Sequence, residues 1–563
     1  NGGSFTIPGG FGSTSIGTLN GSGGGINLGD NALTVTQGSE QTYSGIISGT
    51  GSLVKEGGSR LRLGGANTYS GGTTISNGTL ALVSGGSFGT GDITLDGGTV
   101  GALSSETISN DIAVTANGGF IDVSTSQNFT LGGVISGSQD IAKIGGGTVT
   151  LTGANTYSGE VFIADGELVL SGAGALSSAS IELFENTTFT LANGSGDTSI
   201  VGIEGFSGTL APPTIALNDN TLSIERGLLS NDIVTGTGGI TKTGSGTLRI
   251  ANGTYSYTGA TTLEEGTLEI QLFTGSVSLS PNLIINGGTL HAAKFLGGIG
   301  TFEAGSLSGS GGSITLDTDT RIEITQTSDE SYSGDISGGG ALIKQGASTL
   351  TLTGSNSYSG GTTVSSGALA GTTSGLQGAI VNNSAVTFDQ STTGIYSGAL
   401  SGTGSVTKDG SGTVTFLGAN TYSGGTTISD GRLIGSVAAL PGDITNNAAL
   451  TIDQGVTGTL SGVISGTGSV TKTGSGTLTL SGANTYTGET TVSTGTLALS
   501  GSGTIGATSG RLTINGGTLS LPASYGTLAV GSFGGSGGTL SLSNNDITID
   551  QGANRTYGGI ISG

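Results

Sequence analysis

The chain has 563 residues, of which 116 are glycine and only 9% are charged. It contains no cysteine and one histidine, which excludes disulfides, zinc ribbons and repeated histidine-based triads. Its net charge of −22 disfavours binding to nucleic acid, and no apolar run approaches the roughly 20 residues that span a membrane. We therefore expect no nucleic-acid partner and no membrane contact by this segment.

The chain opens with a block that returns later. Residues 1–49 align without a gap with residues 515–563, and a related, slightly longer copy runs from 286 to 338. Asn1 begins within a strand pattern that is internal elsewhere, and Gly563 stops before an expected strand. We expect the chain to be an excerpt of a longer solenoid whose ends stack or fray.

A second motif recurs six times between these blocks. Its first copy reads GTGSLVKEGGSRLRLGGANTYSGGTTISNGTL, from Gly49 to Leu80. The copies lie near residues 49–80, 137–168, 236–268, 338–369, 402–433 and 466–497. The last two intervals between central tyrosines are equal and the earlier ones are longer; these tyrosines are Tyr69, Tyr157, Tyr257, Tyr358, Tyr422 and Tyr486.

Each copy contains a segment in which apolar and polar residues alternate, as in a strand with one buried face. In the last copy, Leu478 and Leu480 point one way, and Thr477 and Thr479 point the other. The same pattern recurs at Leu61/Leu63, Val149/Leu151, Leu248/Ile250, Leu350/Leu352 and Val414/Phe416. The apolar face is predicted to line a core.

A repeat that is lengthened by whole increments is typical of a solenoid. With about 21 residues in a coil, the interval from Tyr358 to Tyr422 would hold three coils, and the longer intervals would add one or two. Gly, Asn, Asp and Ser would turn the corners, whereas Thr and Ser would cover the outside. We predict an all-β fold, a single parallel β-helix (β-solenoid) of roughly 26 coils that is continuous over residues 1–563.

Two motif residues receive structural interpretations. The tyrosine is expected to lie along the neighbouring coil with its hydroxyl in water. A lysine precedes each tyrosine at an almost constant distance along the chain and is expected to snorkel at a corner. These lysines are Lys55, Lys143, Lys242, Lys344, Lys408 and Lys472.

Acidic residues give few candidate sites. Asp317, Asp319 and Glu323 would offer oxygen ligands to calcium, but an exposed, solvated strand is the favoured interpretation. Glu264–Glu265 is interpreted as a variable corner, and His291 as a surface or edge residue. No groove that combines several carboxylates with Arg or Lys across adjacent coils is legible. We predict no catalytic residue, no cofactor and no metal site.

The acidic residues are unevenly distributed. Twenty of the 37 fall between Glu160 and Asp335, a region that also has the longest intervals between motif tyrosines. If the chain has a binding surface, the extra coils and loops of this region are where we expect it.

The six motif copies resemble the passenger-associated repeat of bacterial autotransporters, and they cover about a third of the chain directly. The resemblance implies a right-handed β-helical passenger that is exported through the outer membrane. It also implies a C-terminal β-barrel translocator in the full-length parent. The GDSGS-type signature of protease passengers is absent from the sequence.

We therefore expect a noncatalytic extracellular stalk or fibre, displayed on the bacterial surface or secreted. It would mediate adhesion or aggregation, or form a surface filament, with another copy of itself, a neighbouring cell, or a host or glycan surface as partner. The alternative is a carbohydrate-binding or carbohydrate-cleaving β-helix. That alternative predicts an aromatic and carboxylate groove on one face, which the sequence does not show.

Overall fold

The computed structural model describes residues 2–206, 210–273, 275–279, 281–295 and 297–563. These residues form 68 short strands, β1 to β68. Within the described ranges there is no helix, and thus none long and apolar enough to cross a membrane.

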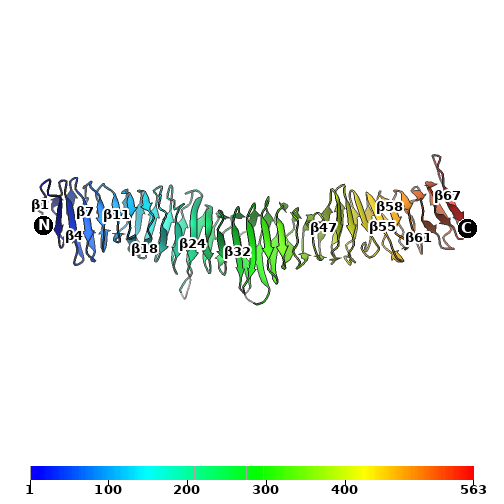
Figure 1. The fold of residues 1–563 in the computed structure, drawn as a ribbon, viewed down its shortest axis with the longest axis horizontal. Helices are drawn as coiled ribbons and strands as arrows, with labels where there is room; N and C mark the ends of the chain where they lie inside the picture. The colour runs from blue at the N-terminus through cyan, green and yellow to red at the C-terminus, as the bar shows by residue number, and fades with distance from the viewer. Residues whose placement is uncertain (1, 207–209, 274, 280, 296) are drawn as a thin grey trace. The chain divides into compact units, whose positions relative to one another are not determined.

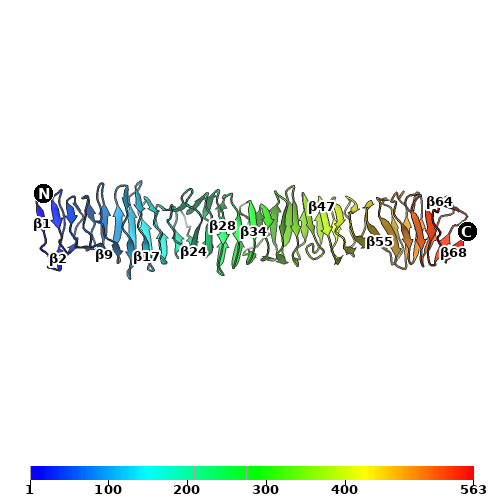
Figure 2. The same ribbon diagram turned by 90° about the horizontal axis from the view of Figure 1, so that it is seen from above.

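The chain forms two compact units, unit 1 (residues 1–297) and unit 2 (residues 298–563). In unit 1, β4 (Ala32–Thr36), β7 (Leu53–Glu56), β9 (Thr73–Ile75) and β11 (Ile93–Leu95) pair in parallel, one coil after another (Figures 1 and 2). Such stacked coils, about 28 among the described residues of both units, confirm the predicted parallel β-solenoid. The single domain over residues 1–563 stays a prediction.

The coils of unit 1 carry three main parallel sheets. Sheet 1 contains β2 (Ser13–Ile16), β4, β7, β9, β11, β14 (Ile112–Val114) and β17 (Ile135–Gly137). Sheet 3 contains β13 (Glu106–Ile108), β16 (Asn128–Leu131), β19 (Thr148–Leu151), β21 (Glu167–Leu170), β23 (Thr188–Leu191), β25 (Thr214–Asn218), β27 (Ile233–Gly236) and β30 (Thr254–Tyr255).

Sheet 2 runs through successive coils of unit 1. Its strands are β5 (Gln41–Tyr43), β8 (Leu61–Leu63), β10 (Thr79–Leu82), β12 (Thr99–Ala102), β15 (Gly119–Val123), β18 (Ile141–Ile144), β20 (Glu160–Ile163), β22 (Ser180–Leu183), β24 (Thr198–Gly205), β26 (Leu222–Leu229), β29 (Thr247–Ile250), β32 (Thr267–Leu272) and β35 (Thr289–Lys294). The long strands β24 and β26 continue round a corner. The first part of β26 therefore pairs with β28 (Ile240–Lys242) and its last part with β29.

Unit 2 repeats this design in staggered sheets. Sheet 4 contains β36 (Gly300–Ala304), β39 (Thr320–Thr325), β42 (Ala341–Gln345), β44 (Thr362–Val364), β46 (Ile380–Asn382) and β49 (Leu400–Ser401). Sheet 5 includes β47 (Ala385–Asp389), β50 (Ser405–Asp409), β52 (Thr426–Ile428) and β54 (Ile444–Asn446). Sheet 6 includes β53 (Arg432–Gly435), β55 (Ala449–Asp453), β58 (Ser469–Thr473) and β60 (Thr490–Val492), and a further sheet includes β59 (Thr477–Leu480).

The alternating pattern has the predicted direction. Leu478 and Leu480 of β59 are buried at 0% and 1% exposure, whereas Thr477 and Thr479 remain partly exposed. The other predicted pairs are also buried: Leu61/Leu63, Val149/Leu151, Leu248/Ile250, Leu350/Leu352 and Val414/Phe416. The core is therefore a column of Leu, Ile, Val and Phe side chains from successive coils.

The close stacking of the coils explains much of the glycine content. At Gly65 a Cβ atom would lie 1.9 Å from the carbonyl oxygen of Gly45 in the preceding coil. At Gly402, where φ is +97°, a Cβ atom would lie 2.2 Å from the carbonyl oxygen of Asn382. A side chain at either corner would force neighbouring coils apart.

The expected three coils in each of the last two intervals between motif copies were an underestimate. Leu342 pairs with Thr362, Thr362 with Ile380, and Ile380 with Leu400, so these coils are shorter than the coil assumed from the sequence. Three coil steps therefore end at Leu400. The residue equivalent to Leu342 in the next copy, Val406, falls on a further strand.

As a result, successive motif copies of unit 2 lie on different sheets. Lys344 is in β42 of sheet 4, Lys408 is in β50 of sheet 5, and Lys472 is in β58 of sheet 6. The motif therefore moves to the next sheet of the coil with each of these intervals.

Candidate binding surface

The motif lysines are buried inside the coil, which corrects the prediction that they snorkel to the surface. Lys55 has 0% exposure, and its ammonium donates to the carbonyl oxygens of Glu56 at 2.8 Å, Gly57 at 2.7 Å and Asn77 at 3.0 Å. Two acceptors belong to the lysine's own corner and the third to the next coil. The same pattern of acceptors recurs at Lys143, Lys242, Lys344, Lys408 and Lys472.

These ammonium groups are charged donors within the fold. Burial lowers the pKa of Lys55, Lys143 and Lys344 to about 8, because desolvation disfavours the protonated form. The three carbonyl acceptors nonetheless satisfy all three ammonium hydrogens. The motif lysine is therefore a clamp between two coils and not a surface group.

The motif tyrosines are also buried, and the prediction of a water-exposed hydroxyl was wrong. The Tyr422 hydroxyl lies 2.6 Å from the Thr426 hydroxyl. Equivalent pairs with the corresponding threonine occur at Tyr69, Tyr257, Tyr358 and Tyr486. In the second copy Val161 replaces the threonine, and the Tyr157 hydroxyl donates to backbone carbonyls instead.

The asparagine of the motif connects three coils. The Asn67 side chain accepts from the Ile47 amide at 2.7 Å and donates to the Ser87 carbonyl at 2.6 Å. Asn356, Asn420 and Asn484 make the same two bonds to the coils on either side. The polar signature of the repeat thus serves internal hydrogen bonding.

The other sequence candidates lie at corners, strands and turns of the coils. Glu264 and Glu265 are at an exposed corner, as predicted, where the Glu265 carbonyl accepts from Lys242. His291 is half-buried on the outward face of β35, and Asp319 lies at a turn with φ of +61°. The described residues hold no group of three or more His, Cys, Asp or Glu side chains arranged for a metal ion.

The outward face of sheet 2 carries a continuous row of side chains that no single stretch of sequence shows. Strand register places Phe120 beside Ala142, Ala142 beside Phe162, Phe162 beside Glu182, and Glu182 beside Glu204. We call these five residues the axial row. The same register continues through Leu228, Arg249, Glu269 and His291.

Two adjacent hollows lie along this row. The first, of about 340 Å³, is lined by Phe120, Ala142, Phe162, Asp140 and neighbouring polar residues. The second, of about 650 Å³, is lined by residues that include Glu160, Ser180, Gly202, Glu204, Arg226 and Arg249. Gly202 has no room for a side chain, because a Cβ atom there would lie 2.8 Å from the Ser180 hydroxyl oxygen.

Two glutamates beside these hollows have a raised pKa. Burial, followed by the charges of Asp140 and Glu204, raises the pKa of Glu160. Burial, followed by the charges of Glu160 and Glu204, raises the pKa of Glu182. None of these three glutamates forms an ion pair with a described residue, although Arg226 and Arg249 also line the second hollow.

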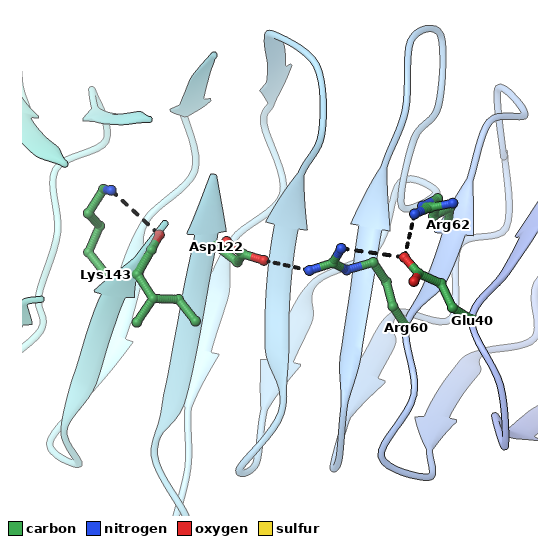
Figure 3. A network of polar contacts seen from close by, with 6 residues as sticks. Glu40, Arg60, Arg62, Asp122 and Lys143 are labelled. Atoms are coloured by element: carbon green, nitrogen blue, oxygen red, sulfur yellow. Dashed lines mark hydrogen bonds and ion pairs between the residues drawn. The ribbon is translucent and has the colours of Figure 1, made fainter. Parts of the chain in front are cut away.

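An ion-pair network lies at the N-terminal side of the axial row (Figure 3). Arg60 pairs with Glu40 at 3.4 Å and with Asp122 at 3.0 Å, although Asp122 is distant in sequence. Arg62 also pairs with Glu40. The two intervening coils carry only the small residues Ala81 and Gly101 in register with Asp122, so the Arg60 side chain can extend across them to reach it.

The sequence shows no cluster of carboxylates with Arg or Lys across adjacent coils, whereas the second hollow brings Glu160, Glu204, Arg226 and Arg249 together. Glu160, Glu182, Glu204 and Arg226 are evenly spaced along the chain, but the coils in this part of unit 1 differ in length, because Glu160 pairs with Ser180, Glu182 with Glu204, and Gly202 with Arg226. Only Glu182 and Glu204 of this set are in register with each other, so the spacing along the chain does not reveal the hollow. All four lie in the acidic region where the sequence placed a possible binding surface.

The chain is similar to known bacterial surface and secreted proteins. The family model "Passenger-associated-transport-repeat" matches residues 53–82, 141–170, 240–270, 342–370, 406–434 and 470–499. The chain is 38% identical over 236 residues, 41% of its length, to 6% of the adhesin BmaC autotransporter of Brucella suis. It is 40% identical over 83 residues, 15% of its length, to 8% of an extracellular serine protease of Serratia marcescens.

The chain thus spans less than a tenth of the length of either curated relative. No solved structure matches it.

Proposed function

Since the chain is a repeat-bearing segment of an autotransporter passenger, exported through the outer membrane to the cell surface, we propose that it is a noncatalytic adhesive stalk. It mediates adhesion or aggregation of cells, and the full-length parent carries a C-terminal β-barrel translocator. The similarity to an adhesin over 41% of the chain is the observation that carries this proposal. The proposal assigns no catalytic residue, metal or cofactor to the segment.

The buried hydrogen bonds of the motif residues support the proposal that the chain is a stalk. The motif lysines and asparagines bond to adjacent coils, as at Lys55 and Asn67, and the motif tyrosines bond within their own copy, as Tyr69 does to Thr73. Such bonds add to the parallel backbone ladder, so the coils resist bending and sliding. Outward side chains are then free to vary and to contact a partner.

Adhesion is tested with beads coated with the purified chain. We expect coated beads to adhere to cells or to cluster with one another, whereas beads that carry an unrelated protein of similar net charge do neither. Coated beads that stay dispersed and unattached contradict the proposed function.

The noncatalytic assignment is tested with peptide, ester and glycan substrates. We expect the purified chain to hydrolyse none of them, and turnover of any of them contradicts the assignment.

A further inference from the structure

The second motif copy differs from the other five on its outward face. Phe162 stands where the remaining copies have threonine, namely Thr74, Thr262, Thr363, Thr427 and Thr491. Inward positions of the same strand, Val161 and Ile163, remain buried and apolar. The departure therefore concerns the surface and not the core.

Phe162 forms one wall of a slot. Phe120, which is 41% exposed, lies two coils away in the same register, with the small Ala142 between them. Coils are about 4.8 Å apart, so the two aromatic side chains are about 10 Å apart. This separation admits one ring-shaped ligand with carbon contacts of about 4 Å on each side.

Polar groups surround the slot. Asn117, Gln139 and Asp140 line it together with the two phenylalanines. Beyond Phe162, the hollow beside Glu160 and Glu204 continues along the same face and contains Arg226. The floor and walls are apolar, whereas the rim offers both hydrogen-bond donors and acceptors.

This combination matches the chemistry of a sugar. A pyranose ring presents C–H groups on its faces and hydroxyl groups around its edge. The faces would pack against the two phenylalanines, and the hydroxyls would donate to Asp140 and Glu160. Carboxylates at Asp140, Glu160, Glu182 and Glu204 outnumber the two arginines of the second hollow, Arg226 and Arg249, and would repel an acidic glycan, which restricts the ligand class.

We infer that the slot between Phe120 and Phe162 holds one pyranose ring of a glycan without acidic groups, and that this glycan continues over Glu182 and Glu204. The inference rests on the proposed adhesive function and gives its partner a chemical class. It concerns binding and includes no cleavage of the glycan.

The test titrates the whole chain with neutral tetrasaccharides of glucose, mannose, galactose and N-acetylglucosamine, and with a heparin tetrasaccharide. Binding is followed by calorimetry. We expect at least one neutral tetrasaccharide to bind and heparin not to bind. Failure of every neutral probe at millimolar concentration overturns the inference, as does heparin binding of equal strength.

Two variants locate the site. Phe162→Thr installs the residue found in the other five copies, and Phe120→Thr removes the opposite wall. We expect each to weaken binding at least tenfold while leaving the thermal unfolding curve unchanged. Phe295→Thr, at another exposed phenylalanine of unit 1 (48% exposed), is the matched control and should bind like the parent chain. Unaltered binding by Phe162→Thr and Phe120→Thr overturns the assignment of the slot.

The bead assay separates this inference from the proposed function. If coated beads adhere but no neutral glycan binds, the adhesive function stands and the slot assignment falls. If the chain binds a neutral glycan through the slot but beads neither adhere nor cluster, the slot stands and the adhesive function falls.

Discussion

At the scale of single residues, the repeat is defined by buried polar groups. Lys408 illustrates this, because its ammonium donates to the carbonyl oxygens of Asp409, Gly410 and Asp430. A buried charge carries a desolvation cost, but its removal leaves three carbonyls without their strongest donor. The lysine therefore stabilises the fold mainly through the hydrogen bonds that it donates to these carbonyls, and not through the burial of its side chain.

We predict that Lys408→Met destabilises the surrounding coils by about 2 kcal/mol. Hydrogen exchange monitored by mass spectrometry should show faster exchange in β50 and β52. Arg432→Met, at an exposed cationic side chain of β53, is the control and should change stability by less than about 0.5 kcal/mol. Equal effects of the two substitutions would show that the carbonyl contacts contribute nothing.

The Tyr422–Thr426 pair allows a double-mutant cycle. Tyr422→Phe should cost about 1 kcal/mol, because it leaves the buried Thr426 hydroxyl without its partner. Thr426→Val should cost a similar amount for the converse reason. The double variant should cost clearly less than the sum of the two, as measured by urea unfolding, and simple additivity would mean that the hydroxyls do not interact.

The buried tyrosines predict a loss of stability at high pH. Burial raises the pKa of Tyr358 and Tyr422 to about 12, whereas unfolded tyrosine ionises near pH 10. Above pH 10 the folded state therefore holds more protons, and stability falls by up to about 1.4 kcal/mol per pH unit per tyrosine.

The lysines act in the opposite sense at lower pH. Lys55, Lys143 and Lys344 lose protons near pH 8 when folded but near 10.5 when unfolded, so they favour folding as the pH rises between these values. The free energy of unfolding should reach a maximum near pH 10 and fall above it. Urea unfolding between pH 7 and 12 tests this, and a steady decline from pH 8 would contradict it.

At the scale of the strand, register is the property that alternation in the sequence predicts well. Leu480 and Thr479 are neighbours in β59, but one faces the core and the other faces outward. The direction of a side chain follows from period-two alternation, which is a local property.

We predict that Leu480→Glu destabilises unit 2 by several kcal/mol, because it buries an unpaired carboxylate. Thr479→Glu should change stability by less than about 1 kcal/mol. Thermal unfolding of the two variants measures the difference. Similar losses in both would contradict the observed register.

Contacts between coils were harder to predict than strands. The tyrosine and threonine of each pair are close in sequence, but TYSGGTT also fits an exposed turn, and burial of the tyrosine depends on the neighbouring coils. The axial row needed the coil length itself, since Glu182 and Glu204 become neighbours only when β22 and β24 are stacked in their observed register. A coil length that is wrong by a single position turns the aligned side chain to the opposite face of the strand. Local patterns thus predicted the fold class, whereas the candidate surface required three-dimensional register.

At the scale of the whole molecule, stability should be distributed along the chain. Each coil contacts its neighbours, so a defect is expected to spread only through nearby coils. In the Leu480→Glu variant, hydrogen exchange should accelerate in β59 and adjacent strands while unit 1 keeps the protection of the parent chain. Uniform acceleration through both units would indicate a single cooperative transition instead.

In unit 2 the motif moves to the next sheet with each interval, and this affects what happens when such a chain gains or loses a repeat. Copying one interval should keep the pattern of strand pairing in unit 2, because the copied coils resemble their neighbours in sequence. It nevertheless redirects the face that each later coil presents, and three copies are needed before a given face points the same way again. The number of repeats therefore sets both the length of the solenoid and the direction, about its axis, in which a given surface faces. A gain or loss of one repeat changes that direction for the later coils without altering any of their residues.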